Sequence, residues 1–106
     1  MTDKIIVFVT CDSKEQAVEI AHALINEKLA ACVNVVPAIW SCYVWEGKLT
    51  WSDELLMLIK TTRGRFEQLR NRIIALHSYE LPEIVAVSIE IAHQKYLDWI
   101  DRSVGG

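Results

Sequence analysis

Short apolar runs and amphipathic segments alternate along this chain in an order that few small folds accommodate. The order is strand, helix, strand, then strand, helix, strand, followed by one more helix. Two such β-α-β units in one small domain are typical of the ferredoxin-like split βαβ pattern. The chain is therefore predicted to be an α+β domain with a four-stranded antiparallel sheet, two crossover helices on one face, and an extra C-terminal helix.

The predicted boundaries follow from hydrophobic spacing. Apolar and β-branched runs predict strands, and apolar residues three and four positions apart predict helices. The strands are expected at 4–11, at 29–36 and 39–45 with Pro37 between them, at 55–61 and at 84–91, and the helices at 14–28, 63–76 and 93–103. Ser13 and Gln16 form a capping-box pattern before the first helix, Thr62 is placed to cap the second, and residues 46–48 form a turn.

Composition narrows the class of protein. The length predicts one domain, residues 1–106. The net charge is −3, and the 11 Lys and Arg residues form no basic run. Both features argue against a nucleic-acid partner and against a membrane-surface anchor. The apolar run 5–9 is too short for a membrane span and lacks the basic leader of a signal peptide. An odd number of cysteines without a CxxC motif favours a reducing compartment, so we expect a cytoplasmic protein.

The segment 39–45 is apolar on both of its faces. Alternation puts one set of large side chains on each side of the strand: Ile39, Tyr43 and Trp45 on one, Trp40, Cys42 and Val44 on the other. Because two helices can cover only one face of the sheet, Trp40, Trp45 and Trp51 would remain exposed in a single chain. Such a patch indicates an interface between copies. The alternative is that one or two of these tryptophans pack under the final helix.

At this point the sequence resembles the CutA family of divalent-cation tolerance proteins over nearly its whole length. Five segments carry the resemblance in order: Glu27–Asn34, Tyr43–Lys48, Leu58–Thr61, His77–Ile84 and Tyr96–Trp99. The resemblance implies a ferredoxin-like subunit in a tightly packed homotrimer, tolerance to copper and other divalent cations, copper binding in some members, and no settled catalytic activity. The trimer also resembles that of PII signal-transduction proteins, which implies an alternative role as a sensor of a small ligand bound between subunits.

The family segments contain a group of polar side chains for which several roles are possible. Lys60, His77, Tyr79 and Glu83 could serve acid–base chemistry if they met in a cleft, or could bind an anion or a small metabolite. Equally, they could form a structural network that fixes a loop and the interface. The family architecture implies that Trp45 and Glu46 border the same inter-subunit pocket.

Metal ligands form no compact motif in this sequence. Cysteine and histidine suit copper, and thiolate suits Cu(I) especially. Cys11, at the end of the first strand, and His77, at the end of the second helix, are the candidate pair for copper or another divalent cation, since both lie at one end of the expected fold. The alternative for Cys11 is a small packed residue. No obligatory cofactor is expected.

Motifs of the common enzyme classes are missing from the sequence. It has no HExxH, no Ser-His-Asp order and no phosphate-binding glycine loop. We therefore expect a binding or regulatory protein rather than an enzyme. The downstream protein partner is not indicated by the sequence.

Overall fold

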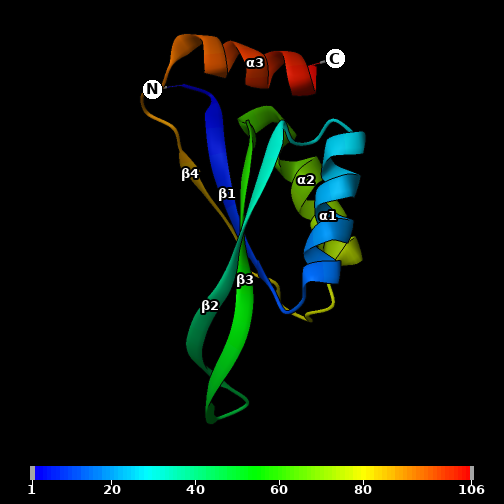
Figure 1. The fold of residues 1–106 in the computed structure, drawn as a ribbon, viewed down its shortest axis with the longest axis vertical. Coiled ribbons are helices and arrows are strands. Elements are labelled where there is room, and N and C mark those ends of the chain that lie inside the picture. The colour runs from blue at the N-terminus through cyan, green and yellow to red at the C-terminus, as the bar shows by residue number, and fades with distance from the viewer. Residues whose placement is uncertain (1, 106) are drawn as a thin grey trace.

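The computed structural model describes residues 2–105 and shows one antiparallel sheet with strand order β2-β3-β1-β4 (Figure 1). This order confirms the predicted ferredoxin-like α+β fold. The elements are β1 (Lys4–Cys11), α1 (Lys14–Asn26), β2 (Cys32–Trp45), β3 (Lys48–Thr62), a 3₁₀ turn (Arg63–Arg65), α2 (Phe66–Leu76), β4 (Ile84–Ser88) and α3 (Gln94–Gly105).

The core lies between the sheet and the two helices α1 and α2. Alternate residues of the central strands β1 and β3 point toward the helices and are fully buried, and the apolar stripes of the helices meet them. The residues with no exposed surface include Val7, Val9, Met57, Ile59, Ile20, Leu24, Leu69 and Ile73. Burying each of these side chains contributes about 1.5–3 kcal/mol of transfer free energy, which makes this layer the main apolar core of one chain.

The first helix begins as the sequence predicts. The Ser13 Oγ accepts a hydrogen bond of 3.1 Å from the backbone N–H of Gln16. Only half of the predicted capping box forms, because the side chain of Gln16 does not return to Ser13. It reaches the end of α2 instead, where its Nε2 donates to the carbonyl of Leu76 at 3.2 Å.

Replacing the cap tests this local energy. Ser13→Ala removes the side-chain acceptor and leaves the Gln16 N–H without its partner, which typically costs about 1 kcal/mol. Urea unfolding of both proteins at one protein concentration measures the loss. Ser13→Asp keeps an acceptor and should lose less, and equal losses from the two variants would contradict the capping role.

The hairpin of β2 and β3 is longer and more continuous than predicted. Pro37 was expected to separate two strands, but β2 runs through it from Cys32 to Trp45. The register steps from Val36 opposite Leu56 to Ile39 opposite Glu54, so two residues of β2 face one residue of β3 in a β-bulge. Ala38 takes a φ of +62° there. The strand continues through Pro37 because β2 is an edge strand. Proline has no backbone N–H, but no ladder hydrogen bond is lost on the side of β2 that has no neighbouring strand.

Several predicted boundaries were wrong. The return strand starts at Lys48 rather than 55, because the hairpin pairs up to its two-residue turn at Glu46 and Gly47, both with positive φ. Thr62 makes no side-chain cap, since a 3₁₀ turn separates it from α2. The fourth strand ends at Ser88, not at 91, because its partner strand β1 begins at Lys4 and offers no ladder beyond that point.

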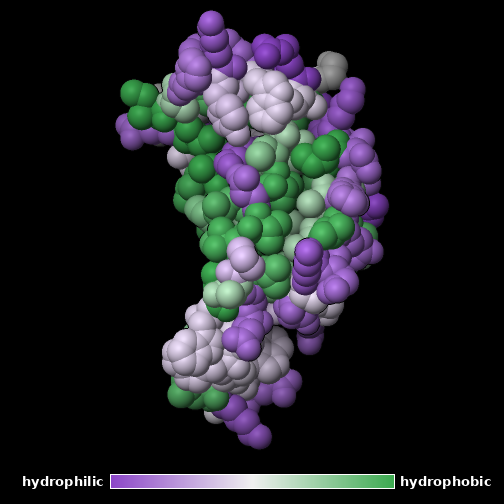
Figure 2. Space-filling model, viewed as in Figure 1, coloured by the Kyte–Doolittle hydropathy of each residue, from purple (hydrophilic) through white to green (hydrophobic). Residues whose placement is uncertain are grey.

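The sheet face away from α1 and α2, here called the open face, is largely uncovered. Its side chains include Ile6 and Phe8 of β1, Leu56 and Leu58 of β3, Val36 of β2, and Val85 and Val87 of β4. Helix α3 lies across one end of the sheet (Figure 1), where the Lys4 ammonium bonds the Asp101 carboxylate at 2.7 Å. Figure 2 shows hydrophobic side chains gathered between α3 and the hairpin. Val85 and Val87 of this face are 51% and 45% exposed.

Candidate functional site

A cleft of about 530 Å³ lies where the hairpin leaves the body of the sheet. Three strands and the loop between α2 and β4 enclose it. Its lining residues are Thr10, Ser41, Cys42, Tyr43, Trp45, Glu54, Tyr79, Glu80, Leu81 and Glu83. Three of them are carboxylates, and none is a lysine, arginine or histidine.

The bulge in β2 decides which hairpin side chains reach the cleft. Because side chains alternate, a shift of one residue exchanges the two faces of a strand. Pro37 and Ala38 both lie opposite Leu55. The odd-numbered residues of β2 after this bulge therefore lie on the same face of the sheet as Glu54. Tyr43 and Trp45 therefore line the cleft, and the hydroxyl groups of Tyr43 and Ser52 lie 2.6 Å apart on that face. Trp40 and Trp51 lie on the other face, their ring centroids 4.6 Å apart.

Glu54 and Tyr79 form the polar centre of the cleft. The Tyr79 hydroxyl donates a hydrogen bond of 2.7 Å to Oε2 of Glu54, which is only 5% exposed. Burial, and then the hydrogen bond to the Glu54 carboxylate, raise the pKa of Tyr79 well above its usual range, so this hydroxyl keeps its proton as a donor. Among residues 2–105, no side chain forms an ion pair with Glu54, and its Oε1 has no hydrogen-bond partner.

His77 fixes the loop that carries Tyr79. Its Nδ1 accepts the backbone N–H of Tyr79 at 3.0 Å, so that nitrogen holds a lone pair. The proton is then on Nε2, which donates to the carbonyl of Thr10 at 2.8 Å. This buried ring joins the end of β1 to the start of the loop, and its centroid lies 4.7 Å from that of Tyr79.

Gln16 is a positioning residue that the sequence did not reveal. Its Oε1 accepts the backbone N–H of Ser78 at 2.7 Å, while its Nε2 donates to Leu76. The α1 side chain thus holds the chain on both sides of His77. In the sequence, Gln16 has the spacing of a helix cap, and nothing there signals a contact more than 60 residues away.

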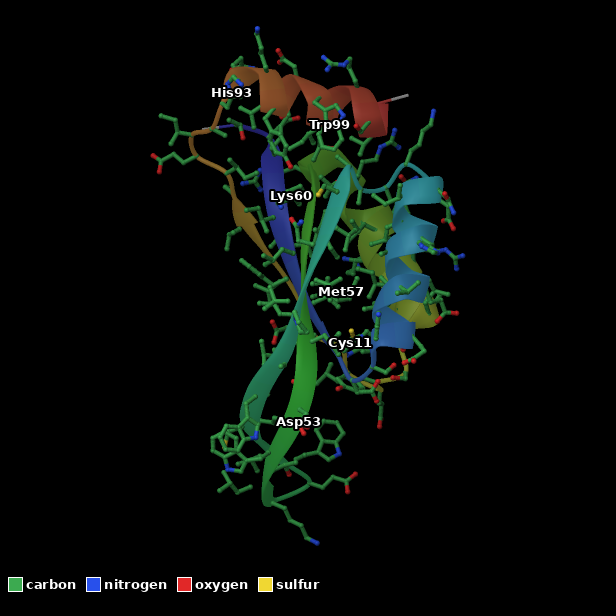
Figure 3. The ribbon with its side chains drawn as sticks, in the orientation of Figure 1. Cys11, Asp53, Met57, Lys60, His93 and Trp99 are labelled. Carbon is green, nitrogen blue, oxygen red and sulfur yellow. The ribbon has the colours of Figure 1, made fainter. Side chains whose placement is uncertain are left out.

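The predicted site residues separate into two groups. Trp45, Tyr79 and Glu83 line the cleft, and His77 braces its loop. Glu46 lies in the hairpin turn and does not line the cleft. Lys60 bonds Asn34 near the α3 end of the sheet, whereas Asp53, the neighbour of Glu54, lies out on the hairpin (Figure 3). One chain therefore does not bring Lys60 to His77 and Glu83, and an acid–base role for these three stays a prediction.

Sequence reasoning missed Glu54, the most buried carboxylate of the cleft. Its position in the sequence was informative, because a carboxylate directly before the apolar run 55–59 lies next to the end of a buried strand. Thr10, Ser41, Cys42, Tyr43, Glu80 and Leu81 were also not named as pocket residues. Their convergence depends on the bulge and on the path of the loop.

Cys11 and His77 lie at the same end of the domain, as predicted, since His77 bonds the residue before Cys11. Their donor atoms are nevertheless engaged. The Cys11 thiol is fully buried, donates toward the carbonyl of Ser13 at 3.8 Å, and has its pKa raised by burial. Both His77 nitrogens have partners. In this arrangement the pair does not fit a copper ion, and no group of three or more His, Cys, Asp or Glu within residues 2–105 is placed to hold a metal. Copper binding by this pair stays a prediction.

Tyr79→Phe measures the strength of the central hydrogen bond. A bond to a charged group typically contributes about 1.5–3 kcal/mol, so we expect a loss of that size in the free energy of unfolding. Tyr43→Phe is the matched control, because its hydroxyl bonds the neutral Ser52 at an exposed position. It should lose less than about 1 kcal/mol. Equal losses in urea unfolding would show that Glu54 does not strengthen the Tyr79 bond.

Known proteins are similar to this chain in sequence and in fold. The family model described as "CutA1 divalent ion tolerance protein" matches residues 5–103. The divalent-cation tolerance protein CutA of Thermus thermophilus is 47% identical over 100 residues, covering 94% of this chain and 97% of that protein. The chloroplastic protein CutA of Arabidopsis thaliana is 42% identical, covering 93% of this chain and 54% of that protein. The crystal structure of CutA from Xylella fastidiosa superimposes with a TM-score of 0.95 at 37% identity, covering 97% and 99% of the two chains. The chain therefore belongs to the CutA1 family of divalent ion tolerance proteins.

Proposed function

We propose that this chain assembles as a homotrimer that acts in tolerance of divalent cations, binds copper only weakly and catalyses no reaction of its own. The observation that carries the assembly is the open face. It continues through Val85 and Val87 to the edge strand β4, and no helix covers it between α3 and the hairpin.

Association would shelter this apolar surface. Burying an exposed valine between copies contributes about 25 cal/mol per Å² of apolar area removed from water. The aromatic side chains of the hairpin add to this stabilisation. Both edge strands, β2 and β4, also present unpaired backbone groups that another copy can pair. That three copies assemble is implied by the family resemblance, and the subunit number is tested below.

Weak metal affinity follows from the side chains available. The thiol of Cys11 and the ring of His77 are already hydrogen-bonded, so a copper ion must displace these bonds before it binds. Affinity gained from the metal is then offset by the cost of leaving Thr10 and Tyr79 backbone groups unpaired. The same reasoning predicts that no metal is needed for folding.

We place the protein in the cytoplasm. Cys11, Cys32 and Cys42 are all unpaired in the structure, as suits a reducing compartment. Within residues 2–105 the longest helix has 13 residues, and none is long and apolar enough to span a bilayer. The Arabidopsis relative carries a chloroplastic label, so fractionation of cells that produce this protein is the direct test.

Native mass spectrometry with and without Cu²⁺ and Zn²⁺ tests the proposal as a whole. We expect a species of about 36 kDa, three times the 12.1 kDa chain, in both conditions. Fewer than one copper per chain should bind at equimolar metal. A folded 12.1 kDa species at low micromolar concentration would overturn the trimer, and one tightly held copper per chain would overturn weak binding.

The PII-like alternative has no specific support here, since the relatives described above are named for CutA or for cation tolerance. A thermal-shift screen separates the two roles. A ligand that binds the native state raises the melting temperature by mass action. A shift with a metabolite and none with metals would favour the sensor.

A further inference from the structure

The open face carries two charges of opposite sign that have no counter-charge within one chain. Lys60 and Glu54 both belong to β3, and their side chains point to the same face because an even number of positions separates them. Lys60 lies opposite Cys32 and bonds the neutral amide of Asn34. Glu54 is 5% exposed and accepts one hydrogen bond, from Tyr79. Within residues 2–105, neither charge takes part in an ion pair.

The two charges are too far apart to pair within one chain. Each residue of a strand advances about 3.3 Å, so the six steps from Glu54 to Lys60 span about 20 Å. An ion pair needs the charged atoms within about 4 Å. Figure 3 shows Lys60 near α3 and Asp53, the neighbour of Glu54, far out on the hairpin. The open face therefore has a cationic end and an anionic end.

Contact between copies through the open face would take both charges out of water. Lys60 is half-buried beside the apolar Ile6 and Leu58, the surface that a neighbouring copy is proposed to cover. Burying an ammonium or a carboxylate alone is strongly unfavourable, whereas a hydrogen-bonded pair compensates this cost. In a closed ring of three copies, each contact joins one patch of a copy to a different patch of the next. A cationic end and an anionic end on the same face provide two such complementary patches.

We propose that Lys60 of one copy enters the cleft of the next copy in the trimer and forms an ion pair with Glu54 there, so that two chains complete each cleft. This pairing rests on the trimer proposed above. Tyr79 acts as a positioning residue, because its hydroxyl occupies Oε2 of Glu54 and leaves Oε1 for the lysine. Glu80 and Glu83 line the same cleft, which has no basic side chain of its own, and their charge favours the approach of an ammonium group.

A double-mutant cycle tests the pair. Lys60→Met keeps the stem of the side chain, Glu54→Gln keeps an acceptor for Tyr79, and each removes one charge. Sedimentation velocity over a concentration series gives the concentration at which half of the assembly dissociates. Each single substitution should raise this concentration at least about tenfold, because the other charge is then buried alone. The double variant should raise it no further than the larger single effect. Single effects that simply multiply in the double variant would overturn the pairing.

Lys48→Met is the matched control. Lys48 lies on the same strand and the same face, also six residues from Glu54, but it is exposed beside the hairpin turn, where its ammonium stays in water. Its removal should change the dissociation midpoint less than about threefold, alone or combined with Glu54→Gln. Coupling of Glu54 to Lys48 in place of Lys60 would show that the assignment is wrong.

Charge reversal gives a second readout that loss of folding cannot imitate. Lys60→Glu and Glu54→Lys each place like charges at every contact and should yield single chains. Both reversals in one chain restore opposite charges and should restore the assembly. Circular dichroism of the same samples reports whether each variant is folded. A doubly reversed chain that is folded but stays single would contradict the pairing.

The unsubstituted chain separates this pairing from the proposed trimer. If it sediments as a folded single chain, the trimer is overturned and the pairing with it. If it sediments as a trimer while the cycle shows no coupling between Lys60 and Glu54, the trimer stands and the pairing is wrong.

Discussion

Val87→Glu is expected to convert the proposed trimer into single chains. In one chain Val87 lies on the open face opposite Ile6 and is 45% exposed, so a glutamate there costs an isolated subunit little. In the assembly the same carboxylate would be buried without a partner, which costs several kcal/mol per copy. Because the proposed trimer would contain the substitution three times, the dissociation constants should rise by at least about 100-fold, where every 1.4 kcal/mol is tenfold. Sedimentation velocity at micromolar concentration measures the change.

Ile74→Glu is the control for this experiment. Ile74 is 53% exposed on α2, on the helical side of the molecule, so the substitution changes charge and hydrophobicity equally at a site away from the open face. It should leave the sedimentation coefficient unchanged. If both variants dissociate, general charge repulsion is the cause, and if neither does, the open face is not the interface.

His77→Ala should give the largest loss of stability among the site variants. The substitution leaves the buried carbonyl of Thr10 and the N–H of Tyr79 without partners, at about 1–3 kcal/mol each. Together these losses lower the free energy of unfolding by about 2–6 kcal/mol. Urea unfolding of both proteins at one protein concentration measures the loss, since the stability of an oligomer depends on concentration.

His22→Ala is the matched histidine control. His22 is exposed on the outer side of α1 and has no hydrogen bond within the described residues. Its removal should change the free energy of unfolding by less than about 0.5 kcal/mol. If His77→Ala behaved the same way, the two hydrogen bonds of the ring would contribute nothing, and the loop would be held by Gln16 alone.

The hairpin shows where sequence reasoning reached its limit. The aromatic and β-branched character of 39–45 predicted a strand correctly, and the two-faced pattern correctly predicted that Trp40, Trp45 and Trp51 remain exposed. Pro37, however, was interpreted as an interruption. A proline can remain within a strand when its missing N–H would face no neighbouring strand. Whether that holds for Pro37 can be known only from the order of the strands in the sheet.

The cleft was predictable only in part for a similar reason. Trp45, Tyr79 and Glu83 came from the family segments, and they do line it. Lys60 came from the same source but lies six residues along β3 from Glu54, on the far part of the strand. Segments that are adjacent in a family pattern need not meet within one subunit, and only the strand register shows which of them do.

The sequence by itself determined the order of strands and helices, the apolar stripes of α1 and α2, and the Ser13 cap, because these depend on periodicity and on contacts between residues a few positions apart. The tertiary structure decided the site. The Tyr79 bond to Glu54 spans 25 residues and the His77 bond to Thr10 spans 67. Such bonds depend on the hairpin register that the bulge sets and on the loop position that Gln16 holds, and no local pattern of residues encodes either.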